Sequence, residues 1–532
     1  MEIPKDTFDI QELQTLPTPP LNSPSCQDDL RLRHLGKRPL LNRSFGFMSI
    51  LGFTCSVMAS WEGILVTSIG GFINGGPAGD IWGFLFNWMG TLATFATIGE
   101  LASMAPTAGG QYHWVAMIAP KKWKNFLSYL TAWLTLLAWQ AMAASIACFL
   151  ATLTQGMIVL TRPDYVSHPW HTVLLMWAYM GLAVAVNSST SRILASFEGM
   201  ALILHLAGFF CILVPLVYYA PKTDAVSVFT TFLNGGGWSS QIISVFVGLP
   251  ASAGPLLGAD SAVHMSEEIQ SAATVVPRAI LYTVVINGIL AFAMVIAMFF
   301  CAGDLNAAIH AGHSLFYPFL HIFKQAVNSS TAACVMGVVI LVTSIPCSVG
   351  VYATASRMIW SFSRDQGLPF SGQLVKLTKN NMPNIAILTT LSISVLVSFV
   401  VLFSAVVFNA LLSLAVAALY SSYLLVCVFL LWRRWTGAFE NHHDLNTMMS
   451  SHHRLVWGPW HVPEPWGTII NAIACVYLTF IWFWTFWPAK TPTTPDTMNF
   501  SVLAFGGLII ACVVWYQGRA KRFFKGPIRE VG

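Results

Sequence analysis

Glu62 lies in the middle of a stretch too apolar to solvate its charge, within the run Ser60-Trp61-Glu62-Gly63. A carboxylate in such surroundings is costly, so it is expected to have a specific task or a specific partner. An anion there would repel a carboxylate and attract an ammonium group, and Trp61 could add a cation–π contact. We therefore expect a ligand with an amine or quaternary ammonium group. The alternative is a buried acid that hydrogen-bonds to the local backbone.

Glu198 and His205 form a second ionisable set inside an apolar stretch. Their separation of seven residues is almost two helical turns, which places both side chains on one face of a helix. Imidazole changes charge near neutral pH, and a buried carboxyl group can hold a proton. Both residues are therefore candidate proton carriers. The alternatives are a histidine that serves helix packing and an acid near the inner membrane face.

The elements that must position these groups follow from the composition of the 532-residue chain. Apolar residues make up 55% of it and charged residues only 9%, and its mean hydropathy is +0.65. A surface so poor in charge cannot face water all round, which excludes a soluble enzyme, a nucleic-acid binder and a disordered scaffold. Most of the ten cysteines lie within apolar runs and are expected to be small buried hydrophobes.

Continuous apolar runs, each long enough to cross a bilayer as a helix, repeat along the chain. We therefore predict an all-α integral membrane protein in which residues 44–518 form one domain, between a disordered cytoplasmic tail (1–43) and a cytoplasmic C-terminal tail (519–532). No apolar run precedes Phe45, so we expect no cleavable signal peptide. The twelve predicted spans are 45–71, 78–103, 127–155, 170–187, 194–219, 240–264, 279–301, 329–358, 384–402, 405–432, 467–487 and 500–517.

The positive charges indicate how these spans are oriented. If the N-terminus is cytoplasmic and the spans alternate, 23 of the 27 Lys and Arg residues fall on the cytoplasmic side. Cytoplasmic loops of membrane proteins carry such an excess of Lys and Arg. Both termini are therefore predicted to be cytoplasmic. The remaining four cations are Arg162, Lys222, Lys324 and Lys490.

Two spans contain residues that interrupt a helix. Span 1 contains the run around Glu62, and span 6 contains Pro250, Gly254 and Pro255 near its middle. Prolines remove backbone donors and clash one turn back, and the freed backbone groups must then face a cavity or a ligand. Breaks in spans 1 and 6 fit a five-plus-five inverted repeat followed by two further helices. The alternative is a simple proline kink in span 6 and an ordinary span 1. The predicted substrate-binding residues are Ser60, Trp61, Glu62, Gly63, Ala253 and Gly254.

Three ordered motifs carry a resemblance to a known family. They are Glu100-Leu101-Ala102-Ser103-Met104-Ala105-Pro106-Thr107-Ala108-Gly109-Gly110-Gln111-Tyr112-His113-Trp114, Gly258-Ala259-Asp260-Ser261-Ala262-Val263-His264-Met265-Ser266-Glu267-Glu268 with Pro277-Arg278, and Ser356-Arg357-Met358-Ile359-Trp360-Ser361-Phe362-Ser363-Arg364-Asp365-Gln366-Gly367. The chain resembles the amino acid–polyamine–organocation (APC) permeases, and more narrowly the fungal amino acid/choline branch with its GABA and choline permeases. The resemblance covers residues 44–518.

The resemblance implies a leucine-transporter-like fold, alternating access and proton coupling. The family normally has glycine and small residues where this chain has Trp61 and Glu62, a departure that weakens the case for binding an α-carboxylate. Some proton-coupled relatives carry a lysine on span 5, which this chain lacks, so sodium coupling stays open. All three motifs fall on the predicted cytoplasmic side, where their charges could form an inner gate or static salt bridges. The inner-gate candidates are Glu100, Asp260, His264, Glu267, Glu268, Arg278, Arg357 and Arg364.

These observations predict a secondary active transporter of a small nitrogenous solute, such as an amino acid, GABA, choline or a related amine. No nucleotide-binding loop or zinc-protease motif occurs in the sequence, and we expect no enzymatic activity, cofactor or metal site. The expected partners are the solute, the lipid bilayer and protons, with no nucleic acid. An exporter of an amine-containing metabolite and a non-transporting nutrient receptor are the alternatives. We expect the plasma membrane, with the vacuolar membrane as the alternative.

Overall fold

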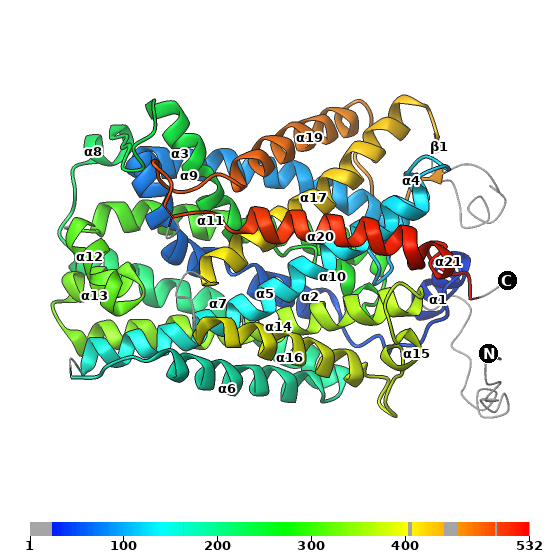
Figure 1. Cartoon of the computed structure of the whole chain (residues 1–532), viewed down its shortest axis with the longest axis horizontal. Coiled ribbons are helices and arrows are strands. Elements are labelled where there is room, and N and C mark those ends of the chain that lie inside the picture. The colour runs from blue at the N-terminus through cyan, green and yellow to red at the C-terminus, as the bar shows by residue number, and fades with distance from the viewer. Residues whose placement is uncertain are drawn as a thin grey trace.

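A computed structural model of the chain describes residues 24–162, 164–303, 305–402, 407–440, 455–494 and 497–530. In Figure 1 most of the long helices run nearly along the long axis of the molecule and form one bundle. The helices α1, α15 and α21 lie at one end of this bundle, and α8, α12 and α13 lie at the other. The only strands in the described part of the chain are a two-residue parallel pair, β1 (Phe439–Glu440) and β2 (Leu455–Val456).

The helices follow the apolar runs of the sequence because a bilayer requires every backbone group of a span to be paired within the protein. Their bounds are α1 Pro24–His34, α2 Phe47–Met58, α3 Ser60–Met104, α4 Gln111–Ile118, α5 Lys124–Thr161, α6 Pro169–Asn187, α7 Ser191–Tyr219, α8 Ala225–Thr230, α9 Gln241–Ala253, α10 Ser261–His264, α11 Ala272–Cys301, α12 Leu305–Leu315, α13 Pro318–Val327, α14 Ser330–Arg364, α15 Ser371–Leu374, α16 Asn384–Ser398, α17 Val407–Trp435, α19 Trp466–Thr485, α20 Ser501–Trp515 and α21 Lys521–Phe523.

The predicted all-α membrane architecture is confirmed. Among the described residues, eleven helical stretches are long and apolar enough to cross a membrane. The first of them, Phe47–Met104, contains two predicted spans joined across a kink at Gly76, whose φ of 70° lies in the region that favours glycine. Pro77 follows directly and starts the second of these spans. With this kink counted as a boundary, the stretches correspond to the twelve predicted spans.

Span 1 is interrupted where the sequence predicts it. Helix α2 ends at Met58, and α3 starts at Ser60. Between them Ala59 adopts a left-handed conformation with φ 42° and ψ 48°, which a regular helix cannot contain. The N-terminal turn of α3 therefore begins in the interior of the bundle, and Glu62 belongs to this first turn.

Span 6 is also interrupted, but later than its first proline suggests. Helix α9 continues through Pro250 and ends at Ala253, and a 3₁₀ turn follows at Gly254–Leu256. The chain is then non-helical until α10, and Gly258 has a φ of 107°. The break therefore begins at Gly254, where the α-helix gives way to the 3₁₀ turn. Pro255 lies in the first turn of this segment, where a helix does not need the N–H that proline lacks.

The terminal segments differ from the expectation of free tails. Residues 1–23, which include the proline-rich part of the predicted disordered tail, lie outside the described residues. Helix α1 starts at Pro24, and Leu32 and Lys37 are buried against the membrane domain. Near the other end of the chain, Phe524 is buried as well. These apolar and paired side chains give both segments enough contacts to be ordered, although each is rich in charge.

Candidate functional site

The interruptions of spans 1 and 6 lie against one another. The hydroxyl of Ser60 donates a hydrogen bond of 2.6 Å to the carbonyl oxygen of Pro255. A methyl group on Gly63 would lie only 3.0 Å from Cβ of Pro255, so a larger residue there would push the two breaks apart. The backbone N–H of Ser60 donates to Oδ1 of Asn287 on α11 at 3.1 Å, which satisfies a donor that the broken helix leaves free.

A buried acid–base pair lies at this junction. Oε1 of Glu62 is 2.9 Å from Nδ1 of His205 on α7, and both side chains are almost fully buried. The other carboxylate oxygen, Oε2, and the other ring nitrogen, Nε2, have no hydrogen-bond partner among the described residues. The pair therefore retains one acceptor position and one titratable nitrogen. The sequence predicts both residues as functional but does not predict that they contact each other.

Trp61 packs against this pair. Its ring centroid lies 5.9 Å from that of His205 and 6.1 Å from that of Phe209, and the side chain is fully buried. Its indole therefore packs toward α7. Trp61 thus forms a wall beside the imidazole, and the cation–π contact with a ligand stays a prediction.

The remaining predicted binding residues lie on the facing backbone. Ala253 is buried, whereas Gly63 and Gly254 are half-buried. A methyl group on Gly254 would meet only Cγ2 of Val416 on α17, at 3.8 Å. Gly254 therefore leaves more space beside its backbone than Gly63 does.

Glu198 lies on the same face of α7 as His205, as the spacing predicts, and both are buried. Its Oε2 accepts a hydrogen bond of 2.9 Å from the hydroxyl of Ser56 on α2, and Oε1 has no partner among the described atoms. Ser56 precedes the Ala59 break on α2, whereas Glu62 follows it on α3. The two acids therefore lie on either side of the Ala59 break within one buried region.

Asp260 and His264, the candidate gate residues on the second half of span 6, are both buried. Oδ2 of Asp260 lies 3.8 Å from Nε2 of His264 and accepts a hydrogen bond of 2.7 Å from Nε2 of Gln111. Its Oδ1 accepts one of 2.5 Å from the hydroxyl of Tyr423 on α17. The carboxylate thus joins α4, α10 and α17.

The other gate candidates form pairs that the sequence predicts only in part. Arg357 pairs with Glu268, and Arg364 with Glu267, both at 2.9 Å. Arg278 is exposed. Glu100 pairs with Arg434 on α17, a residue outside the predicted set.

Sequence reasoning also misses further buried ionisable side chains, among them Lys37 and Asp80. Lys37 pairs with Asp365 across the end of the bundle. Asp80 is buried in α3, and neither carboxylate oxygen has a partner among the described residues. The position of Asp80 just inside a predicted span indicates a buried acid. Lys37 lies in a charged tail, where nothing in the sequence distinguishes it from the other cations.

Comparisons with known proteins agree with this architecture. A sequence model of the family described as "Amino acid permease" matches residues 45–510. A choline transporter of Saccharomyces cerevisiae is 28% identical over 487 residues, which is 91% of this chain and 83% of the relative. A homologue of the amino-acid permease BAT1 from Oryza sativa is 27% identical over 94% of this chain and 95% of its own. Amino-acid permease 2 of Neurospora crassa is 25% identical over 96% and 91%.

Proposed function

Since the chain belongs to the amino acid permease family, and is therefore a multi-pass membrane transporter of amino acids or amines, we propose a proton-coupled cycle centred on Glu62 and His205. The observation that carries this proposal is the buried contact of 2.9 Å between their side chains at the break of span 1. The exporter and receptor alternatives are not favoured by relatives that are named transporters and permeases.

The substrate feature recognised by this site is an amine or a quaternary ammonium group. Oε2 of Glu62 has no partner among the described residues, and a substrate cation beside it would compensate a charge that is costly inside the bundle. The named relatives, a choline transporter and amino-acid permeases, handle solutes that all contain such a nitrogen. The half-buried backbone at Gly254 forms the opposite wall.

The proton carriers in this proposal are His205 and Glu198. Among the described residues, the hydroxyl of Ser56 is the hydrogen-bond partner of Glu198, so the charge of this carboxylate is poorly compensated. We assign it a proton while it is buried and a release step when one side opens. His205 links this proton to the substrate, because protonating the imidazole changes the charge that Glu62 presents.

Alternating access requires the broken helices to move relative to the rest of the bundle. The ion pairs of Arg357 with Glu268 and of Arg364 with Glu267 join α14 to the segment after α10, so they serve as the inner gate. We assign this end of the bundle, with both termini, to the cytoplasm, and the excess of Lys and Arg on its loops supports the assignment. The membrane is assigned as the plasma membrane.

Uptake by a permease-deficient yeast tests the substrate and the coupling together. The panel holds choline, GABA, a polyamine and neutral, acidic and basic amino acids, at two pH values, with and without a protonophore. Saturable, protonophore-sensitive uptake of one amine-containing class is expected. Uptake that ignores the protonophore and requires sodium would overturn proton coupling.

The variant Glu62→Gln tests recognition of the amine. Leaving a substrate cation buried without its counter-charge costs about 3–5 kcal/mol, so uptake at low substrate concentration should fall at least about a hundredfold. Asp224→Asn, a change of equal charge at the exposed start of α8, is the matched control. Normal kinetics in Glu62→Gln, at equal surface abundance, would contradict the role of this carboxylate.

A further inference from the structure

A polar cavity of about 510 Å³ opens at the end of the bundle where α7 begins, away from the junction of the broken helices. Four segments that are distant in sequence converge on it: the chain before α2, the start of α7, the chain before α11 and the chain before α16. We name it the basic cavity. Its lining residues are Asn42, Arg43, Ser44, Thr190, Ser191, Arg192, Gln270, Lys379 and Asn380.

The lining of the basic cavity carries three cations and no acid. Arg43 is neutralised, because its Nη2 lies 3.0 Å from Oδ1 of Asp29. Arg192 and Lys379 are exposed, and neither takes part in an ion pair within the part of the chain that the structure describes. Two uncompensated positive charges at one cavity favour an anion as its occupant.

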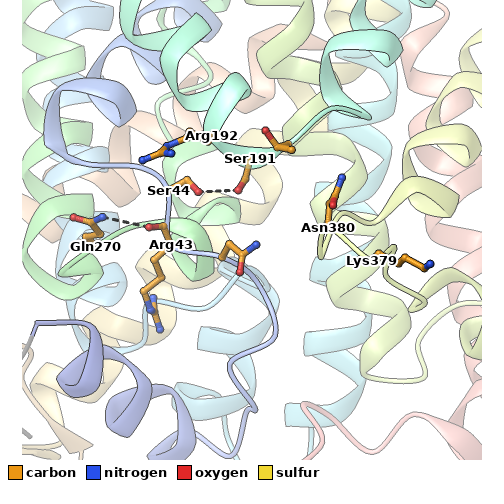
Figure 2. A pocket seen from close by; sticks show the side chains of 9 residues that line it. Arg43, Ser44, Ser191, Arg192, Gln270, Lys379 and Asn380 are labelled. Atoms are coloured by element: carbon orange, nitrogen blue, oxygen red, sulfur yellow. Dashed lines mark hydrogen bonds between the residues drawn. The ribbon is translucent and has the colours of Figure 1, made fainter. Parts of the chain in front are cut away.

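Polar groups around these charges match the same kind of ligand. The hydroxyls of Ser44 and Ser191 lie 2.8 Å apart, as the dashed line in Figure 2 shows, and Ser191 is the first residue of α7. The amide of Gln270 donates to the carbonyl oxygen of Arg43 at 3.3 Å and fixes the wall beside them. Hydroxyl donors, guanidinium and ammonium groups and a helix N-terminus are the groups that bind phosphate.

The surroundings of the basic cavity are apolar and exposed. Directly beyond its lining residues, Met48 on α2 is 62% exposed, Ile193 on α7 is 55% exposed and Ile385 on α16 is 39% exposed. Exposed side chains continue along these helices, at Met200 and Leu388 for example. Helices that span a membrane present such faces to acyl chains. A ligand with a charged headgroup and apolar tails fits both the basic cavity and the apolar faces beside it, whereas a free phosphate would contact only the cavity.

We propose that the basic cavity binds the phosphate-bearing headgroup of an anionic phospholipid through Arg192 and Lys379, with the acyl chains along α7 and α16. Lying also against the hydroxyls of Ser44 and Ser191, the bound headgroup would join the chain before α2 to the start of α7. The segment before α2 is also held to the loop after α10, because the N–H of Phe45 donates to the carbonyl oxygen of Glu268 at 3.0 Å. Occupancy of the cavity therefore favours the conformation in which α2 lies against α7.

Binding can be measured without transport, so the result is independent of the proposed transport function. The full-length protein is placed in nanodiscs of phosphatidylcholine, and phosphatidylserine or a phosphoinositide is titrated in, with retained lipids counted by native mass spectrometry. Each basic residue near an anionic membrane surface contributes about fivefold to affinity, so Arg192→Ala with Lys379→Ala should weaken binding about 25-fold. Arg192→Lys with Lys379→Arg should retain binding.

The matched control is Lys121→Ala with Lys122→Ala, which removes two exposed charges from the loop between α4 and α5. Affinity that falls equally in both double variants would show general attraction to the membrane and overturn the proposal. Inorganic phosphate and a soluble inositol phosphate form the second arm. If either binds as tightly as the lipid and displaces it, the cavity takes a free anion and the lipid assignment fails.

Discussion

At the scale of single residues, several buried polar atoms of the candidate site have no hydrogen-bond partner among the described residues. Glu62 and His205 satisfy each other through one atom each, and their second polar atoms have no partner among the described residues. Glu198 is similar, with one oxygen bonded to Ser56 and one free. Ionisable groups inside a membrane span are costly, and the grouping of Glu62, His205 and Glu198 in one buried region is the reason for proposing that transport uses them.

Replacing His205 by asparagine should remove the step that responds to pH near neutrality. Asparagine keeps a polar group near Glu62 but cannot titrate. Between pH 5 and 8 we expect the uptake rate to become nearly flat, with maximal uptake about tenfold lower. The rate is measured by initial uptake at saturating substrate in buffers across this range. A wild-type pH profile in this variant would show that the imidazole does not couple to protons.

Replacing Glu198 by glutamine should abolish substrate accumulation driven by a pH gradient while leaving substrate exchange across the membrane intact. The amide resembles the protonated acid and cannot release a proton, so the carrier can reorient only in its protonated-like form. We expect exchange of labelled substrate across proteoliposome membranes to continue, while accumulation driven by a pH gradient is lost. Ser56→Ala, which removes only the hydrogen-bond donor, should retain accumulation. Loss of both activities in Glu198→Gln, with the protein folded, would contradict a pure coupling role.

At the scale of elements, the close approach of α2 to α7 depends on the absence of a side chain at one position. A methyl group on Gly52 would lie 2.3 Å from the carbonyl oxygen of Glu198, a backbone atom that cannot move without α7. This contact holds α2 against the helix that carries both candidate proton carriers. The position of α2 and the surroundings of Glu198 are therefore coupled.

Gly52→Ala should destabilise the protein by about 1–3 kcal/mol, because overpacking a tight interface forces the backbones apart. Gly181→Ala is the control, since Gly181 lies within α6 and a methyl group there meets nothing within 4 Å. The melting temperature in detergent should fall for the first variant and stay unchanged or rise slightly for the second. Equal behaviour of the two variants would mean that α2 and α7 do not pack this closely.

The elements themselves could be predicted from sequence, because a membrane span is a local pattern of apolar residues and a break is a local run of prolines and glycines. The second interruption, at Gly254, was accessible in this way, whereas the first, at Ala59, was indicated by the polar run Ser60–Gly63 inside an apolar stretch. The pairing of Glu62 with His205, or of Glu100 with Arg434, joins segments 143 and 334 residues apart. Such partners depend on how the helices pack, which a single sequence does not specify.

At the scale of the whole molecule, the segment after α1 and the segment after α21 meet beside the proposed inner gate. The N–H of Glu530 donates to the carbonyl oxygen of Gly36 at 2.6 Å, and the carboxylate of Glu530 pairs with Arg364 at 2.5 Å. Lys37 pairs with Asp365, the residue after Arg364 in the sequence. We name these contacts the terminal clasp. Because Arg364 also pairs with Glu267, opening the gate and releasing the clasp involve the same guanidinium group.

The terminal clasp should weaken in acid. Burial raises the pKa of Glu530, but hydrogen bonds and ion pairing with Arg364 outweigh it, and the pKa lies below its ordinary value of 4.5. The clasp contribution is therefore complete above pH 4.5 and is lost as the pH falls through the lowered pKa. Hydrogen exchange at residues 526–530 should stay slow down to about pH 5 and, after correction for intrinsic rates, become faster below about pH 4.

Glu530→Gln provides the matching control for this titration. It removes the charge while keeping hydrogen-bonding atoms, so exchange at residues 526–530 should already be fast at pH 7 and independent of pH after the same correction. If the wild-type and variant proteins exchange equally at pH 7, the carboxylate of Glu530 does not hold the C-terminal segment in place.

The kink at Gly76 has a consequence for how the protein is made. Only one residue between the first two spans leaves helical geometry, and Gly71 and Asp80 on its two sides are in direct contact. No hydrophilic loop separates the spans, so the insertion machinery has no exposed segment at which to pause between them. We expect the first two spans to leave the ribosome and enter the bilayer together, as a helical hairpin. An epitope inserted at Gly76 to map topology would disrupt biogenesis, whereas the longer connection between α5 and α6 offers a better insertion point.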